Sequence, residues 1–212
     1  DSMDLWIQPL QSTTAMTDAQ PWQLWIALLA YSIKIYADFS GYSDIAIGSA
    51  RLFGIVVPEN FNFPYLKPNI TLFWRNWHIS LTSWITDYVF IPLGGSKGSL
   101  STTVRNILLA MAVSGIWHGA NWHFVVWGLY HGLLLAIHRV FREKIQPKIL
   151  GLESFSWFLT PLANLMTFFL VTLGWGLFIM PVERFGFLLQ RLVYFSNNLI
   201  FSCIPLYGNF IR

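Results

Sequence analysis

Long apolar runs with few polar positions dominate this 212-residue sequence. The longest, 106–138, has no Asp, Glu, Lys or Arg, and a second uncharged run occupies 154–182. A third apolar stretch, 21–35, begins at Pro21, a residue that suits the first turn of a helix. Runs of this length and composition predict membrane-spanning helices, and we expect the last of them within 157–205.

The run 106–138 is too long for one straight span. As a continuous helix its 33 residues would extend about 50 Å, against a hydrocarbon core of about 30 Å. Gly115, Gly119 and the Ala120-Asn121 step are the natural breaking point, which gives two legs of about 16 residues meeting near His118. Basic residues flank both ends, and the positive-inside rule places both flanks in the cytoplasm. We therefore predict a hairpin whose tip lies deep in the protein and lines a cavity.

A helical pattern of a different kind occupies residues 69–91. Apolar side chains recur there every three or four residues, whereas Arg75 and His78 fall on the opposite side. Asn69 or Thr71 can cap the start of this segment. The pattern predicts a continuous amphipathic helix that lies in the membrane interface. Taken alone, His78 is equally well explained as part of a solvated helix face.

The passage 34–48 is unusually polar for a segment that continues an apolar run. Lys34 and Asp38 are four residues apart, as are Ser40 and Asp44, so each pair can meet on one helix face. One interpretation is a helix that leaves the membrane into the polar interface. The other is a polar wall that faces a cavity.

Composition supports a membrane protein. Apolar residues make up 55% of the chain and charged residues 11%, less than half the usual share of about 25%. The basic residues behind the net charge of +3 do not cluster as in a nucleic-acid-binding surface. The single cysteine, Cys203, allows no internal disulfide and is expected to be a small buried apolar side chain, and no His/Cys spacing indicates a metal site. Residues 1–20 predict a loop or the tail of a preceding element, and the absence of a leader sequence suggests a piece of a longer protein.

His118 is the most informative single residue. An ionisable group in a membrane segment is costly and marks a functional site by default, although a hydrogen bond to a neighbouring helix is the alternative. A neutral imidazole in a dry cavity is a natural general base for a hydroxyl that attacks an acyl carbonyl. Since neither a G-x-S-x-G nor an H-E-x-x-H motif is present, the attack need not pass through a serine or a metal-bound water.

Two other histidines of the same run have simpler explanations. His131 follows Gly128 in a Gly-x-x-x-Gly pattern that favours close helix packing, and we expect it to form a hydrogen bond within that packing. His138 adjoins Arg139 and is expected at the interface. The role of His123 is left open.

Four motifs in order resemble the membrane-bound O-acyltransferase superfamily, and most closely its alginate O-acetylation branch. The resemblance covers 34–141, with a looser match at 174–178. Its motifs are ADFSGYSDIAIG at 37–48, FWRNWHISL at 73–81, YVFIPLGG at 88–95 and GIWHGANW at 115–122.

The resemblance implies an all-α, polytopic membrane fold with broken or re-entrant helices and interfacial helices. Residues 1–212 would form a single membrane domain, the C-terminal portion of a protein about twice this length. The activity implied is transfer of an acetyl or other acyl group from a cytoplasmic donor to hydroxyls of an exported polysaccharide, at the cytoplasmic (inner) membrane. No tightly bound cofactor is implied, because acetyl-CoA or an acylated carrier is a substrate. Membrane lipid, the polysaccharide, periplasmic acetyltransferase proteins and a cytoplasmic acyl-donor protein are the implied partners.

The resemblance also assigns roles to residues. His118 corresponds to the catalytic histidine of the family, and His78 to its second characteristic histidine. The expected substrate-lining residues are Asn121, Trp122, Trp117, Asp38, Ser40, Tyr42, Asp44, Arg75 and Trp77. In the related D-alanyl transferases a carrier protein docks on the segment that matches Asp87, Tyr88, Val89, Phe90 and Ile91. Asn76 and Thr86 stand where relatives often have Arg, which changes the charge of the face that the donor would meet.

Two other functions fit parts of the pattern. One is a D-alanyl or other acyl transferase of the same superfamily. The other is a transporter or channel in which His118, Asp38 and Asp44 form a proton or substrate pathway. A transporter would not need the second histidine motif of 73–81, which therefore favours the acyltransferase.

Overall fold

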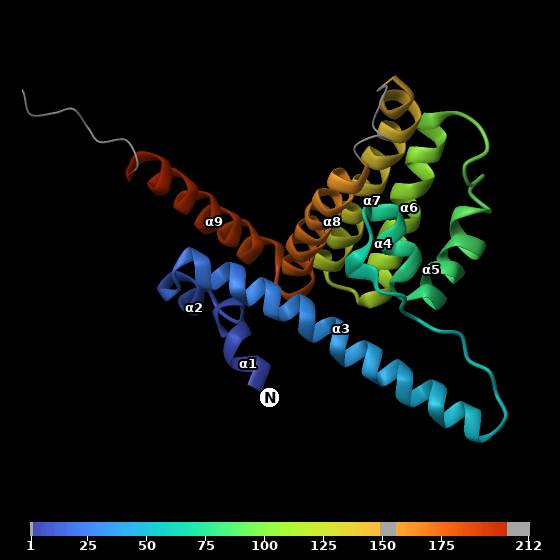
Figure 1. Cartoon of the computed structure of the whole chain (residues 1–212), viewed down its shortest axis with the longest axis horizontal. Coiled ribbons are helices and arrows are strands. Elements are labelled where there is room, and N and C mark those ends of the chain that lie inside the picture. Colours follow the sequence, from blue (N-terminus) through green and yellow to red (C-terminus); the bar gives the residue numbers. More distant parts are fainter. Residues whose placement is uncertain (1, 149–155, 203–212) are drawn as a thin grey trace, which may run out of the picture.

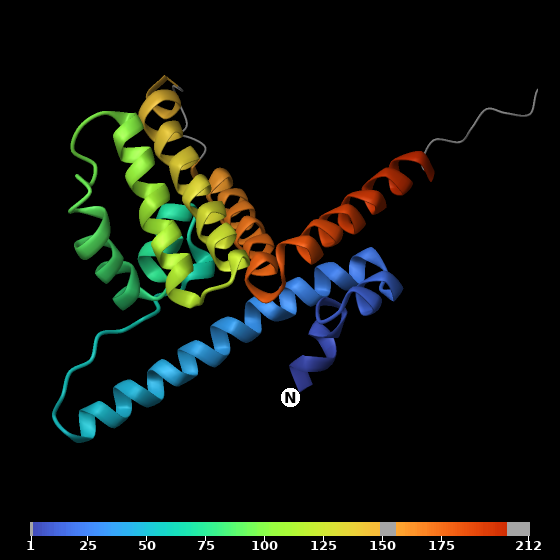
Figure 2. The same cartoon turned by 180° about the vertical axis from the view of Figure 1, so that it is seen from behind.

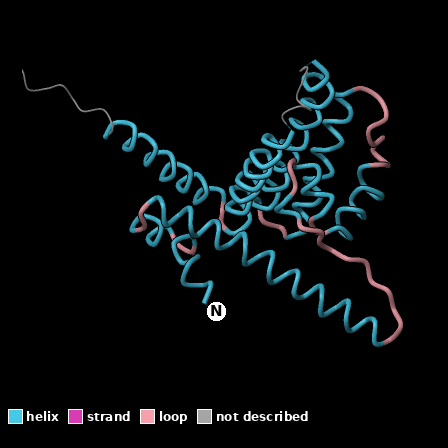
Figure 3. Tube along the Cα trace, in the orientation of Figure 1, coloured by secondary structure: helices cyan, strands magenta, loops and turns pink. Residues whose placement is uncertain are grey.

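The computed structural model describes residues 2–148 and 156–202. Helices joined by loops make up this part of the chain, and no strand occurs in it (Figure 3). Cys203 and the end of the membrane segment expected within 157–205 lie outside the described residues. The prediction of an all-α fold is confirmed.

The N-terminal residues form short helices, so the predicted loop over 1–20 is wrong. Helix α1 spans Ser2–Ile7, a 3₁₀ turn η1 spans Gln8–Leu10, and α2 spans Thr13–Asp18. Ser12 caps α2, because its hydroxyl accepts a hydrogen bond of 3.0 Å from the backbone N–H of Ala15. Short polar helices of this kind lack the long apolar periodicity on which the prediction relied.

Helix α3, Pro21–Leu52, is a single helix of 32 residues that crosses below the helical bundle (Figure 1, blue to cyan). It begins at Pro21 as predicted, and a capping box between Gln20 and Gln23 closes its first turn. Despite its length it is not among the helices apolar enough to cross a membrane. The charge of Lys34 pairs with Asp4 of α1, at 2.7 Å, and not with Asp38. The apolar start and the polar passage therefore belong to one continuous helix.

The amphipathic segment after α3 is broken. A 3₁₀ turn η2 (Pro64–Leu66) precedes α4 (Ile70–Asn76), which is followed by α5 (Ile79–Ile85) and a π-helical turn η3 (Thr86–Phe90). The capping role of Asn69 is confirmed, since its Oδ1 accepts from the N–H of Leu72 at 2.9 Å. The prediction of one continuous helix is wrong because His78 has a φ of 44°, in the left-handed region, which interrupts the helix.

Helices α6 (Leu100–His118) and α7 (Trp122–Val140) form the predicted hairpin, and turns η4 (Phe141–Ile145) and η5 (Gln146–Lys148) extend α7. The break falls where the sequence placed it, at Gly119, whose φ of 152° suits glycine. The two helices touch closely, because a Cβ on Gly115 would collide with the carbonyl of Phe124, and one on Gly128 with that of Met111. The glycines therefore serve helix packing.

The depth of the hairpin tip in the membrane stays a prediction. Each leg has 19 residues instead of about 16 and is long and apolar enough to cross a membrane by itself. The described residues leave the tip uncovered, since the side chain of Trp122 is 79% exposed.

Helix α8 (Ser156–Ile179) packs beside α7, and α9 (Val182–Ser202) diverges from the bundle along the start of α3 (Figures 1 and 2). With α6 and α7, residues 159–179 of α8 complete the three candidate spans found in the described residues. Tyr65 ties three elements together at the core. Its hydroxyl donates to the carbonyl of Ser32 at 2.7 Å and accepts from Trp175 Nε1 at 3.0 Å.

Candidate active site

His118 is the last residue of α6 and lies in a cage of aromatic rings. The ring centroids of Trp127 and Phe178 are 5.1 and 4.9 Å from that of the imidazole, and each ring stands edge-on to it. No described residue forms a hydrogen bond with the imidazole, yet its nitrogens are not sealed from solvent. The alternative that His118 bonds a neighbouring helix is therefore not what this part of the chain shows. An accessible, unpartnered imidazole can accept a proton from a bound hydroxyl.

The structure brings His78 to the same place, although it lies 40 residues earlier in the sequence. The ring of Trp117 connects the two histidines, with its centroid 5.7 Å from that of His78 and 4.9 Å from that of His118. On its other side His78 meets the ring of Phe39 from α3, at 4.6 Å. The second histidine motif thus converges on the first.

The protonation state of His78 follows from its surroundings. Burial lowers its pKa to about 4, so the imidazole is neutral at pH 7. Its Nδ1 lies 3.4 Å from Oδ1 of Asn60, an acceptor, which favours the tautomer with the proton on Nδ1. Ser80 holds that amide in place by donating to the same oxygen at 2.6 Å. Nε2 of His78 is then left to accept a hydrogen bond.

Two further residues of this region were not among the predicted site residues. Asn60 lies in the loop after α3, and its Nδ2 donates to the hydroxyl of Ser43 at 3.4 Å. Ser43 is buried, whereas the predicted lining residue Tyr42 beside it is 69% exposed. The helical periodicity of α3 could have predicted that Ser43 is buried and Tyr42 exposed. Nothing in the sequence around Asn60 indicates that it belongs to the site.

The other predicted lining residues divide into several groups. Asp38 and Tyr42 line an open hollow on α3 together with Lys34. Ser40 is half-buried and bonds its own helix, and Asp44 is exposed. None of the four contacts His118 in the described part of the chain, and their role in the site stays a prediction.

The predicted residues of the bundle are also split. Trp117 reaches both histidines, whereas Asn121 and Trp122 are exposed at the hairpin tip. Trp77 is 4% exposed and packs in the aromatic core against Phe73 and Trp175. The structure thus brings Trp117 alone of these four into contact with the imidazoles.

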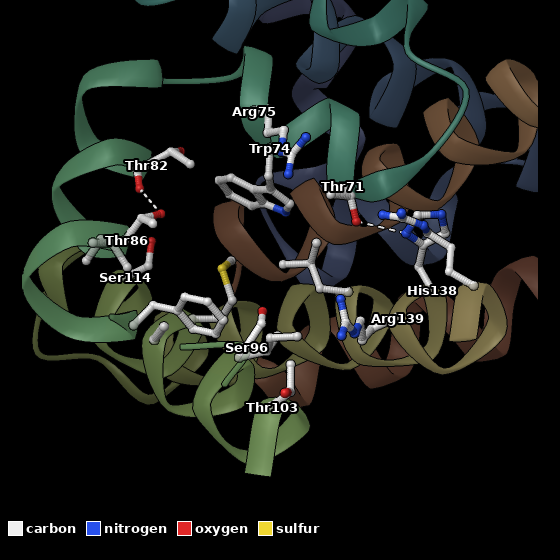
Figure 4. A pocket seen from close by; sticks show the side chains of 17 residues that line it. Thr71, Trp74, Arg75, Thr82, Thr86, Ser96, Thr103, Ser114, His138 and Arg139 are labelled. Carbon is white, nitrogen blue, oxygen red and sulfur yellow. Dashed lines mark hydrogen bonds between the residues drawn. The ribbon is translucent and has the colours of Figure 1, made fainter. Parts of the chain in front are cut away.

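A partly open cavity of about 290 Å³ lies between α4, α5 and the α6–α7 hairpin (Figure 4). We call it the inner cavity. A polar and small-residue stripe of α6 forms one wall, from Thr103 to Ser114. His118 is the next residue on that helix face, one turn beyond Ser114. At the opposite end, Arg75 and Arg139 line the cavity. It therefore extends from the basic end of the hairpin toward His118.

The expected docking segment lies at the surface. Tyr88 and Ile91 are 67% and 57% exposed, and Asp87 is exposed as well. Val89 is half-buried, and Phe90 turns inward to line the inner cavity. The segment is thus available to a partner and adjoins the cavity, while docking itself remains a prediction.

The remaining histidines differ from one another. His138 Nδ1 lies 2.8 Å from Oγ1 of Thr71, so it joins α7 to α4. His131 is fully buried among aromatic rings, and neither nitrogen has a hydrogen-bond partner in the described residues, contrary to the expected packing bond. His123 contacts the ring of Phe124, with centroids 4.1 Å apart. No group of three or more His, Cys, Asp or Glu among the described residues could hold a metal ion.

Comparison with known proteins agrees with this geometry. Residues 8–180 match the membrane-bound O-acyltransferase family. The chain is 45% identical over 164 residues to a probable alginate O-acetylase of Azotobacter vinelandii, covering 77% of this chain and 31% of the relative. It is 41% identical over 162 residues to a peptidoglycan O-acetyltransferase of Helicobacter pylori, covering 74% and 28%. A teichoic acid D-alanyltransferase of Bacillus subtilis is 35% identical over 158 residues, covering 71% and 40%.

The match spans less than a third of the length of the first two of these relatives. It nevertheless includes both histidine motifs, the docking segment and the three candidate spans. A transporter is set aside, because the relatives are named as acetyl and D-alanyl transferases. The chain belongs to the membrane-bound O-acyltransferase family.

Proposed function

We propose that this chain carries the transfer site of a membrane acyltransferase that moves an acetyl group from a thioester donor to a hydroxyl of a polysaccharide. The observation that carries the proposal is the accessible, unpartnered imidazole of His118, with the neutral His78 held beside it across Trp117. The family match and the alginate O-acetylase relatives support the choice of acetyl group and polymer.

In the proposed reaction His118 acts as general base. The neutral imidazole accepts the proton of the acceptor hydroxyl while the oxygen attacks the thioester carbonyl. The carbon–sulfur bond then breaks, and the proton passes to the departing sulfur, which completes the transfer.

His78 acts as a positioning residue in this scheme. With its proton on Nδ1, its Nε2 is an acceptor that can hold a second hydroxyl of the sugar or an amide of the donor. The inner cavity would take the donor from the basic end of the hairpin as far as Ser114, one helical turn before His118. Acetyl-CoA and an acylated carrier protein both fit this path, and a carrier would dock on the exposed Asp87–Ile91 segment.

The test uses the intact parent protein in membranes, with acetyl transfer to polysaccharide as the readout and matched protein abundance. His118→Ala should lower the transfer rate by about a hundredfold or more, the usual contribution of a general base. His78→Ala should lower it less, and His123→Ala, which removes a nearby histidine outside the cage, should leave it unchanged. Transfer at the wild-type rate by His118→Ala would refute the assignment.

A second candidate, D-alanyl transfer, is favoured by one observation, the 35% identity to a teichoic acid D-alanyltransferase. The same membranes distinguish the two reactions when they are supplied with acetyl and D-alanyl donors in parallel. We expect His118-dependent transfer from the acetyl donor. His118-dependent transfer from the D-alanyl donor alone would replace the acetyl proposal.

A further inference from the structure

A second and larger hollow lies on the outer side of the inner cavity. It has a volume of about 670 Å³ and runs between α4, α7 and α8, and we call it the outer groove. The two hollows share Thr71, Arg75, His138 and Arg142, which therefore stand in the wall between them. Neither His78 nor His118 lines the outer groove. The outer groove is thus a hollow to which the proposed transfer chemistry assigns no role.

The shared wall gives the outer groove a cationic end. In the described part of the chain, neither Arg75 nor Arg142 has a carboxylate partner, whereas Arg139 beside them pairs with Glu143 at 3.2 Å. Nδ1 of His138 is engaged by Thr71, as Figure 4 shows, which leaves its Nε2 available. Two unpaired guanidinium groups on one hollow attract a phosphate, since guanidinium binds phosphate through paired N–H donors.

Apart from Asn69, Gln146 and Thr167, the rest of the outer groove is lined by apolar residues, several of which are exposed. Ile137 and Phe141 of α7 line one side, 56% and 38% exposed, and Met166 of α8 lines the other, 60% exposed. Leu134 and Leu170 continue the two walls along the helices. A wall of this kind on two candidate membrane spans suits a hydrocarbon chain, which a free phosphate does not possess.

The depth of the groove along the helices suits the same occupant. Arg142 follows the last turn of α7, at the basic end of the candidate span Trp122–Lys148, whereas Leu134 lies about two turns further in. A phospholipid has the same order of groups, with a phosphate at the level of the headgroups and chains below it. The basic end and the apolar walls of the groove therefore follow the same order as the phosphate and the acyl chains of a phospholipid.

We propose that the outer groove binds an anionic phospholipid. Its phosphate is held by Arg75, Arg142 and Nε2 of His138, and one acyl chain lies along the apolar walls of α7 and α8. Because the same residues form the wall of the inner cavity, a bound lipid also fixes the side chains that line the basic end of that cavity. The inference does not depend on the proposed transfer reaction, since it concerns a separate hollow.

The binding test uses the full-length parent protein, purified in detergent and stripped of lipid. The shift in its melting temperature is measured against increasing phosphatidylglycerol, phosphatidylcholine, diacylglycerol or inorganic phosphate. We expect phosphatidylglycerol to stabilise the protein at the lowest concentration. Equal stabilisation by diacylglycerol, or by inorganic phosphate alone, would overturn the proposal, because one lacks the phosphate and the other the chains.

Three variants locate the site. Arg142→Gln should raise the phosphatidylglycerol concentration needed for half the shift about fivefold, the usual contribution of one basic residue near lipid headgroups. Met166→Trp, which fills the apolar part of the outer groove and does not line the inner cavity, should have a similar effect. Lys144→Gln removes a charge from the same turn but lines neither hollow, so it should change binding less than twofold. An equal effect of Lys144→Gln would indicate unspecific attraction and refute the site.

A competition experiment separates the lipid from the acyl donor. Coenzyme A also carries phosphates, and it could reach the same arginines from the inner cavity. If coenzyme A displaces phosphatidylglycerol and Met166→Trp leaves lipid binding unchanged, the arginines serve the donor and the phospholipid site is refuted. We expect phosphatidylglycerol to remain bound, and native mass spectrometry to detect a larger lipid-bound fraction of the wild type than of Met166→Trp.

Discussion

The two ends of the α6–α7 hairpin have opposite chemistry. At the tip, His118 lies among aromatic rings with the neutral His78 nearby, and no charged side chain contacts either imidazole among the described residues. At the base, Arg75 and Arg142 line two hollows, and His138 is held by a short hydrogen bond to Thr71. In the two proposals, the same residue type thus serves proton transfer at one end and binding at the other. The difference lies in the neighbours, not in the histidines.

The contrast depends first on the close contact of the two helices. Gly128→Val places side-chain atoms where the carbonyl of Met111 lies, so α6 and α7 must separate. We expect this substitution to have the largest effect of all, a loss of folded protein from the membrane. The measurements are the abundance of the parent protein in the membrane and its melting temperature in detergent. Gly186→Ala is the matched control, because nothing lies within 4 Å of an added Cβ there.

Stability should respond to pH at the tip through His78. Its folded pKa of about 4 lies below the unfolded value of 6.5, so between these values the unfolded chain binds more protons. The contribution of the neutral His78 to the free energy of unfolding is therefore fully present above about pH 6.5 and is lost as the pH falls toward 4. Because His78 is only partly buried, solvent reduces the effect to about 1–2 kcal/mol. The measurement is the melting temperature of the parent protein from pH 7 to 4.5.

The variant His78→Gln provides the comparison for this pH dependence. Gln keeps a hydrogen-bonding group but does not titrate, so the acid-dependent loss of stability should become smaller by the contribution of His78. An identical pH dependence in the variant and the wild type would show that His78 does not titrate between these limits. It would leave the proposed role of His118 untouched.

A smaller effect is expected at the base. Thr71→Val removes the partner of His138 Nδ1 at 2.8 Å while it keeps the shape of the side chain, which should cost about 1 kcal/mol. The measurement is again the melting temperature of the parent protein. His138→Gln in the same background tests the origin of the loss. If the two groups interact, the double variant should lose less stability than the sum of the losses in the two single variants. Full additivity would contradict a direct bond.

The sequence predicted the hairpin well because its determinants are local. An uncharged run of 33 residues cannot remain one straight span, and a break at glycine costs little backbone strain. The length of the legs was less accessible, because α6 begins at Leu100, before the uncharged run, and α7 continues beyond that run to Val140.

The break at His78 could not be predicted, because its cause is distant in the sequence. No glycine or proline marks the position. Instead, the loop after α3 pairs with the broken backbone on both sides, since Asn62 N donates to Asn76 O at 3.1 Å and Ile79 N donates to Asn60 O at 3.0 Å. These bonds compensate the left-handed conformation of His78. The family motif indicated that His78 belongs to the site, whereas only the fold shows that it faces Trp117.

The smallest effect is expected between the two ends, at His131. It resembles His118 in lacking a hydrogen-bond partner among the described residues, but it is fully buried and packs against Trp74, Trp127 and Trp175. A hydroxyl cannot reach such an imidazole, so it cannot act as a base, and an apolar side chain should serve there as well. His131→Leu should therefore keep acetyl transfer within about twofold of the wild type and leave stability equal or slightly higher.

Transfer by His131→Leu and His118→Leu, measured at matched abundance, tests this distinction directly. The substitution is the same and both residues belong to one hairpin, so the two variants differ in the accessibility of the imidazole that is removed. Loss of transfer in His118→Leu alone would locate the chemistry at the tip. If His131→Leu lost transfer to the same extent while its melting temperature was unchanged, accessibility would not be what separates the two histidines. The buried imidazole would then have to act through Trp127, the ring that contacts both.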